Sequence, residues 1–155
     1  MRKPLATLLI GIALTSVAMF GADSSVGTWK LNTAKSQSTS ANPIKSQTDV
    51  RETLPDGTSK LTRTAELADG TVVNYSVTFK YDGHEYPATG APYDFVSVKR
   101  INGTTTTFST RKSDGKYRMA GQSVVSKDGK TLTQKYKGVD AQGKPVVSTL
   151  VFNRQ

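Results

Sequence analysis

The sequence predicts an all-β protein, an antiparallel up-and-down meander of about 8–10 strands that closes into a barrel. Three observations lead to this prediction. β-Branched and aromatic residues alternate with polar residues along many short runs, glycine-containing turns separate these runs, and no stretch after residue 22 has helical periodicity. Adjacent hairpins joined by tight turns are typical of a meander, in which each strand pairs with the next.

The first 22 residues have the layout of a secretory signal peptide. A basic start, "MRK", is followed by the uncharged apolar run "PLATLLIGIALTSVAMF". The small residues of "SVA" and "FGA" then predict cleavage after Ala18 or Ala22. A membrane anchor kept in the mature protein is the alternative, and the run is short for a span of roughly 20 residues. We expect an exported protein, periplasmic or extracellular, with residues 23–155 as a single barrel domain.

The composition restricts which partners the domain can have. The chain contains no cysteine, which excludes disulfides, thiolate metal sites and a lipidated cysteine after the leader. Its 21 basic and 12 acidic residues give a net charge of +9, which becomes +7 once Arg2 and Lys3 leave with the signal peptide. A basic surface either attracts anionic envelope components or serves solubility. We expect no nucleic-acid partner, because the aromatic residues alternate inward, and no stable membrane span after signal cleavage.

The strands follow one another along the whole domain. The most regular is 71–81, where every second residue from Val73 to Tyr81 is apolar or aromatic and the residues between are polar. The segment 31–43 is rich in Ser, Thr and Asn, which favours a loop with room for one short helical turn. The other strands are expected at 27–31, 44–54, 58–67, 93–101, 104–112, 116–126, 130–137 and 145–153.

Closure of this meander into a barrel would remove its exposed edges. A two-sheet sandwich is an alternative, with a long connection at 81–92 as its crossover. An outer-membrane barrel is a third possibility, but 44–54, 58–67 and 130–137 lack a continuous apolar face.

The stretch 81–90, "YDGHEYPATG", interrupts the hairpin rhythm and contains the single histidine, His84. Prolines cannot donate to a strand ladder, so Pro87 and Pro92 predict that the chain leaves the sheet at this point. We expect a long turn or the rim of a cavity, with a loop at the cavity mouth formed by His84, Tyr86 and Tyr93.

No catalytic signature is present, so we expect a protein that is not an enzyme and has no metal or cofactor. One histidine cannot build a multi-histidine metal site, and its acidic neighbours in a glycine-containing loop make a poor cage. No Gly-x-Ser-x-Gly motif marks a nucleophile, and no phosphate-binding glycine loop precedes a helix.

Two short motifs point to a family. "GTWKL" (27–31) near the start of the domain and "FNRQ" (152–155) at its end resemble the calycin superfamily of lipocalins and fatty-acid-binding proteins. The resemblance implies that Gly27 and Trp29 open the first strand and that Arg154 packs across the tryptophan to close the barrel floor. Beyond these motifs, the chain is similar over the whole domain to uncharacterised secreted bacterial lipocalin-like proteins, through "YDGHEYPATG", "VSVKRI", "SKDGKTLT" and "DAQGK".

The resemblance implies a lipocalin-like barrel that binds a small hydrophobic or amphipathic ligand without catalysis. A barrel of about eight strands either holds one small ligand or fills itself with side chains. The alternative is therefore a solid-core structural or interaction module that acts through its basic outer surface on an envelope polymer or a protein. The residues expected to face inward and to line a cavity are Val73, Tyr75, Val77, Phe79, Tyr117, Met119, Leu132 and Tyr136.

Overall fold

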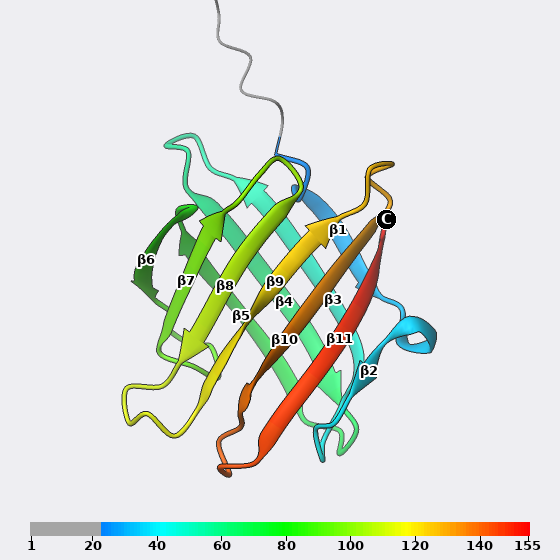
Figure 1. Cartoon of the computed structure of the whole chain (residues 1–155), viewed down its shortest axis with the longest axis vertical. Helices are drawn as coiled ribbons and strands as arrows, with labels where there is room; N and C mark the ends of the chain where they lie inside the picture. Colours follow the sequence, from blue (N-terminus) through cyan, green and yellow to red (C-terminus); the bar gives the residue numbers. More distant parts are fainter. Residues whose placement is uncertain (1–22) are drawn as a thin grey trace, which may run out of the picture.

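Across residues 23–155, the part of the chain that the structure describes, eleven antiparallel strands form one sheet that curls into a nearly closed barrel (Figure 1). The structure is a computed structural model, and the expected leader, residues 1–22, lies outside the described residues. The all-β barrel predicted from the sequence is therefore confirmed. The strands are β1 (Gly27–Leu31), β2 (Gln37–Ser38), β3 (Ile44–Thr53), β4 (Ser59–Leu67), β5 (Val72–Phe79), β6 (Asp82–Pro87), β7 (Phe95–Arg100), β8 (Thr105–Arg111), β9 (Arg118–Val125), β10 (Thr131–Val139) and β11 (Pro145–Arg154).

The sheet order is β5-β4-β3-β1-β11-β10-β9-β8-β7-β6, with the short β2 paired to β11 beside this path. Apart from β2, and from β5 and β6, which do not pair, strands that follow one another in the chain are neighbours in the sheet, as in a meander. The pairing of β1 with β11 joins the two halves of this meander. This pairing makes the fold a barrel rather than a two-sheet sandwich. Figure 1 shows β7–β11 on the near face and β3–β5 on the far face.

Asp-Gly turns set the register of most hairpins. In the turn between β3 and β4, Gly57 has a φ of 79°, a left-handed conformation that glycine adopts without steric cost. The turn pairs Thr53 with Ser59, and the ladder then continues to Ile44 and Leu67 with one irregularity near its end. The turn chemistry thus decides which side chains of β3 and β4 lie opposite each other.

Two clusters of apolar side chains lie at different places in the barrel interior. The floor cluster lies at the end that carries the C-terminus and consists of Trp29, Val125, Leu132, Leu150 and Phe152. The second cluster lies where the sheet is interrupted, because β5 and β6 do not pair. It consists of Tyr75, Val77, Phe79, Ala88, Tyr93, Val96 and Val98, and their packing replaces the missing ladder.

The prediction that 81–90 is a turn was wrong for most of this stretch. Residues 82–87 form strand β6, which pairs with β7 through a register irregularity between Asp82 and Glu85. The connection that follows, 88–94, folds back onto the barrel and buries Ala88 and Tyr93 in the second cluster. Pro87 ends the strand, which is consistent with the inability of proline to extend a ladder.

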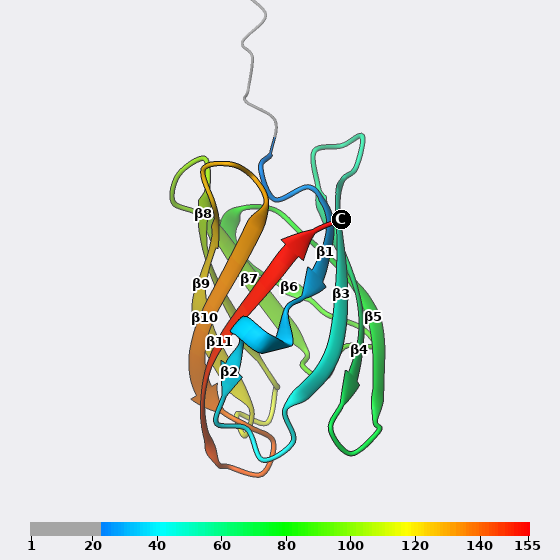
Figure 2. The same cartoon turned by 90° about the vertical axis from the view of Figure 1, so that its right-hand side faces the viewer.

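The segment between β1 and β3 contains little regular structure. A single 3-10 turn, η1 (Thr33–Lys35), is capped by Asn32, whose side chain accepts a hydrogen bond from the Lys35 amide. The two residues of β2 then pair with Ser148 and Thr149 of β11 (Figure 2). Within residues 23–155, no helix has the length and the apolar character that crossing a membrane would require.

Candidate functional site

The barrel interior contains a cavity of about 500 Å³ above the floor cluster. Its lining comes from both faces of the barrel and from the segment between β1 and β3, including Ser36, Ser40 and Pro43. Leu67 and Asp140 line it as well, at the ends of β4 and β10 that lie away from the Trp29 floor. The cavity therefore runs from the floor region toward the opposite end of the barrel, and its volume is that of a site for one small ligand.

Four of the eight residues expected to line a cavity do so, and four pack elsewhere in the interior. Phe79, Tyr117, Met119 and Tyr136 are in the cavity wall. Leu132 is fully buried in the floor cluster. Val73, Tyr75 and Val77 belong to the second cluster or pack against it.

The three residues expected to form a loop at the cavity mouth lie in two different places. His84 is exposed on β6 and Tyr86 is half-buried there, with its hydroxyl donating to Asp82 at 2.6 Å, and neither side chain lines the cavity. Assigning these two residues to a mouth loop was wrong, because the stretch pairs with β7 as an edge strand. Tyr93, by contrast, is buried in the cavity wall.

The residues expected to close the barrel floor are in mutual contact. Trp29 pairs with Arg154 across the β1–β11 ladder, and the guanidinium carbon lies 4.2 Å from the tryptophan ring centroid. Gly27 has a φ of 132°, and a side chain at this position would collide with the Arg154 guanidinium. Glycine at position 27 thus gives Arg154 the space it needs to cover the tryptophan.

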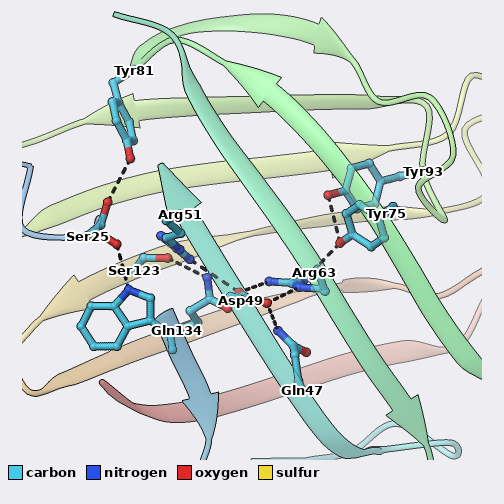
Figure 3. A network of polar contacts seen from close by, with 11 residues as sticks. Ser25, Gln47, Asp49, Arg51, Arg63, Tyr75, Tyr81, Tyr93, Ser123 and Gln134 are labelled. Atoms are coloured by element: carbon cyan, nitrogen blue, oxygen red, sulfur yellow. Dashed lines mark hydrogen bonds and ion pairs between the residues drawn. The ribbon is translucent and has the colours of Figure 1, made fainter. Parts of the chain in front are cut away.

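The segment that precedes β1 makes a second set of contacts beside the floor. The Trp29 indole donates to the Ser25 carbonyl oxygen, and the Ser25 hydroxyl lies 3.0 Å from the Tyr81 hydroxyl (Figure 3). Arg100 stacks over the Tyr81 ring at 4.0 Å and forms an ion pair with Asp23 at 2.7 Å. These contacts hold Tyr81 in place, and Tyr81 in turn lines the deep part of the cavity.

A buried cluster of charges lies in the interior on β3 and β4 (Figure 3). Asp49 is 0% exposed and accepts two hydrogen bonds from Arg63, from Nε to Oδ1 at 2.8 Å and from Nη2 to Oδ2 at 2.7 Å. The Gln47 amide donates a third bond to Oδ1 at 2.9 Å. The carboxylate is thus held by a bidentate charged partner, the strongest form of such a pair.

Arg51 has no comparable partner. Its Nη2 atom lies 3.9 Å from Asp49 Oδ2, and its side chain is 12% exposed. Its Nε is one of two buried side-chain nitrogen or oxygen atoms among residues 23–155 without a hydrogen-bond partner, the other being Gln47 Oε1. Both Arg51 and Arg63 line the cavity.

The cluster carries an excess of positive charge, because two guanidinium groups share one carboxylate and arginine stays protonated in proteins. Burial alone would raise the pKa of Asp49, but Arg63 and Arg51 outweigh it and the pKa lies below its usual value. Burial and repulsion from Arg63 lower the pKa of Arg51, against the attraction of Asp49. The pKa of Arg63 is raised, since Asp49 more than compensates for burial.

Two tyrosines extend the hydrogen-bond network beyond Asp49 and Arg63. Arg63 Nη1 donates to the Tyr75 hydroxyl at 3.2 Å, and the Tyr93 hydroxyl donates to the same oxygen at 3.2 Å. Burial, followed by the proximity of Tyr75, raises the pKa of Tyr93 well above its usual value. Tyr93 therefore stays protonated and acts as a hydrogen-bond donor.

The described residues contain no cluster of metal-ligating side chains. No three His, Asp or Glu side chains within residues 23–155 come together in a way that could hold an ion. His84, the one histidine of the sequence, lies outside the cavity and is exposed. The chemistry that the site offers is hydrogen bonding and charge recognition.

Arg51 and Arg63 are not among the residues predicted from the sequence to line a cavity. Gln47, Asp49 and Arg51 alternate inward on β3, but their polarity makes this face indistinguishable from a solvent-facing one. A signal was available in the turn at 55–57, because a hairpin that pairs Thr53 with Ser59 also places Asp49 opposite Arg63. Opposite charges at paired positions of a hairpin indicate an ion pair.

No family model and no curated protein sequence matches this chain. Solved structures share its fold. The fluorescent protein UnaG is 14% identical, with a TM-score of 0.57 over 84% of this chain and 97% of that one. The fatty acid binding protein of Schistosoma mansoni, solved with arachidonic acid, is 16% identical, with a TM-score of 0.50 over 85% and 96%. The zebrafish ileal bile acid-binding protein, solved with cholic acid, is 14% identical, with a TM-score of 0.50 over 85% and 99%. These similarities show that the fold is a calycin-like barrel.

Proposed function

We propose that this protein binds a small amphipathic molecule inside its barrel, with an anionic group of the ligand at Arg51. The observation that carries the proposal is the guanidinium of Arg51, which lines a cavity of about 500 Å³ and whose buried Nε has no hydrogen-bond partner. A buried charge without a full counter-charge costs several kcal/mol, so such a group is retained where a ligand completes it. An oxyanion would accept hydrogen bonds from Arg51 and neutralise the excess positive charge.

The rest of the wall suits the apolar part of such a ligand. Phe79 and Phe108 line the cavity together with Tyr136 and Met119. Aromatic rings offer large apolar contact areas, and methionine adapts its shape to irregular surfaces. A pocket with mostly apolar walls and a few polar groups is typical of small-molecule sites, in which the polar groups fix the orientation of the ligand.

The structures with this fold support the proposal by analogy. Arachidonic acid and cholic acid, the molecules bound in two of them, both combine a carboxylate with a large apolar body. Fold alone does not determine function, so the weight rests on the Arg51 site of this chain.

We further propose that binding takes place outside the cytoplasm, in the periplasm or beyond the cell, and involves no catalysis. The support is the leader-like composition of residues 1–22, which predicts export and cleavage after Ala18 or Ala22. Expression with the leader and intact-mass measurement of the secreted protein test this. We expect the mass of a chain whose first residue is 19 or 23. Uncleaved protein that keeps residues 1–22 and is found in a membrane fraction would contradict this proposal.

Competition binding tests the ligand proposal. Purified protein is loaded with anilinonaphthalene sulfonate, an anionic fluorescent probe, and titrated with dodecanoate or with the matched alcohol dodecanol. We expect the carboxylate to displace the probe at about tenfold lower concentration than the alcohol, a difference of about 1.4 kcal/mol. Arg51→Met should remove this preference and leave the affinity for the alcohol unchanged.

Arg118→Met is the matched control, because Arg118 is exposed on the outside of β9 and should not affect binding. Carboxylate binding that is insensitive to Arg51→Met would overturn the proposal. The alternative, recognition of an anionic envelope polymer by the basic outer surface, predicts binding that weakens steeply with salt and depends on exposed residues such as Arg118.

A further inference from the structure

We infer that the ligand carries, besides its anionic group, an uncharged hydroxyl or carbonyl group that binds a row of three polar side chains deep in the cavity. The row consists of Thr106, Ser123 and Gln134, on β8, β9 and β10. This inference rests on the proposed function and narrows the ligand from amphipathic anions in general to those with a second polar group on the apolar body.

The three residues are direct cross-strand neighbours. Thr106 pairs with Ser123 in the β8–β9 ladder, and Ser123 pairs with Gln134 in the β9–β10 ladder. All three are buried and all three line the cavity. Successive inward positions on neighbouring strands thus form one continuous polar strip.

The strip is enclosed by apolar layers on both sides. Toward the floor, the next inward residues on β9 and β10 are Val125 and Leu132, both in the floor cluster. Away from the floor, Phe108 and Tyr136 lie on either side of Gly121 in the ladders, with ring centroids 6.3 Å apart. A polar strip at this position is therefore not an extension of the solvent-facing surface.

The strip has hydrogen-bonding capacity that the protein does not use. The Gln134 amide donates to the Ser123 hydroxyl at 3.1 Å (Figure 3). That bond leaves the Ser123 hydroxyl proton and the Gln134 carbonyl oxygen available to a ligand. Within residues 23–155, the side-chain hydrogen bonds include none from or to the Thr106 hydroxyl, although this residue lines the cavity.

The position of the strip relative to Arg51 sets the geometry of the ligand. Arg51 lies on β3, on the far face of the barrel in Figure 1, whereas β8–β10 form part of the near face. A ligand with its anion at Arg51 therefore has its body against the opposite wall. A hydrocarbon chain placed there would displace water from the three polar side chains. Their hydrogen bonds to water would then be lost without replacement, which is unfavourable for buried polar groups. A hydroxyl or carbonyl group would restore those bonds.

Matched ligands test the inference without any mutation. Octadecanoate is compared with its monohydroxylated derivatives, with the hydroxyl at successive positions along the chain, by displacement of anilinonaphthalene sulfonate. We expect at least one hydroxylated acid to bind about tenfold more tightly than octadecanoate, the gain of one satisfied buried hydrogen bond. Equal or weaker binding of every hydroxylated acid would overturn the inference.

Variants then locate the effect. Thr106→Val conserves side-chain shape, and Thr106→Val combined with Ser123→Ala and Gln134→Leu makes the strip apolar. The triple variant should lose the preference for the hydroxylated acid and bind octadecanoate as tightly as before or more tightly. Thr107→Val is the control, because Thr107 lies on the same strand with its side chain outside the cavity lining, and it should keep the preference. A preference that survives in the triple variant would overturn the assignment to this strip.

The two proposals fail in different ways. Acids that bind through Arg51 with no effect of hydroxylation would overturn only the polar strip as a recognition element. Failure of every acid to displace the probe, with no effect of Arg51→Met, would overturn the proposed function and this inference together.

Discussion

The Arg154 guanidinium lies 4.2 Å from the Trp29 ring centroid and also donates to three backbone carbonyl oxygens, those of Ser24, Val26 and Gly129. One side chain from the last strand thereby joins the tryptophan of the first strand, the segment before it and the β9–β10 turn. A planar guanidinium can serve all these partners at once, because its donors point in fixed directions while its face covers the ring.

This geometry predicts that Arg154→Lys is not a conservative change. The lysine keeps the charge but loses the fork that reaches three carbonyl groups, and we expect the free energy of unfolding to fall by about 1–3 kcal/mol. Arg154→Met should cost at least as much. Urea unfolding followed by Trp29 fluorescence measures both. An Arg154→Lys variant as stable as the wild type would show that charge alone closes the floor.

Neutralising Asp49 should destabilise the barrel strongly. Asp49→Asn leaves Arg51 and Arg63 as two largely buried positive charges without a carboxylate, and we expect a loss of about 3 kcal/mol. Adding Arg51→Met to this variant should restore part of the stability, because one of the two charges is removed. Denaturant unfolding of the single and double variants checks this. A double variant less stable than Asp49→Asn would contradict it.

The lowered pKa of Asp49 makes part of the stability acid-sensitive. The unfolded chain takes up the proton near the ordinary value of 3.8, whereas the folded protein does so only at lower pH. The contribution is therefore complete above about pH 4 and is lost as the pH falls through the folded pKa. Unfolding free energies measured between pH 6 and pH 3 should fall more steeply for the wild type than for Asp49→Asn. Parallel profiles would mean that Asp49 is not stabilised in its charged form.

Most strands could be predicted from the alternation of apolar and polar residues, but β6 could not. In β5, the alternation of Tyr75, Val77 and Phe79 with exposed polar residues identifies the strand, because one face of the strand is buried. In β6, nearly every residue is exposed, since the strand pairs only with β7 at the edge of the sheet. No alternation can develop there, and Gly83 and Pro87 made the stretch look like a turn.

The candidate site could be predicted only in its apolar part. Phe79, Tyr117 and Met119 follow the rule that apolar residues face inward, and they line the cavity. Arg51 and Arg63 are exceptions to that rule, because the buried Asp49 carboxylate lets their charges face the interior. Positions that violate a local pattern are expected at functional sites, where stability is given up for binding.

A substitution of Arg51 tests directly whether stability is given up for binding at this site. In the absence of ligand, Arg51→Met removes a buried charge that has only a partner at 3.9 Å, and Asp49 keeps its bonds from Arg63 and Gln47. We expect the ligand-free variant to be more stable than the wild type by about 1–3 kcal/mol. Thermal unfolding of delipidated protein is the measurement. A less stable variant would indicate that Arg51 has a structural role rather than a role in binding.

Tyr93 should make the fold sensitive to alkali. Burial and the neighbouring Tyr75 raise the pKa of Tyr93, so the folded protein keeps a proton that the unfolded chain loses near pH 10. The corresponding stability is complete below about pH 10 and is lost as the pH rises further. Tyr93→Phe keeps the ring but loses the hydrogen bond to Tyr75, so its stability should decline less steeply between pH 9 and pH 11.

Absorbance titration of the phenolates isolates the ionisation of this residue. The sequence has six tyrosines, and Tyr93 should contribute to the signal only after unfolding. Tyr93→Phe should therefore leave the amplitude of the native titration unchanged and lower the amplitude in denaturant by one tyrosine. Loss of one tyrosine from the native amplitude would show that Tyr93 ionises within the folded barrel, and that its hydroxyl is not held as a donor beside Arg63.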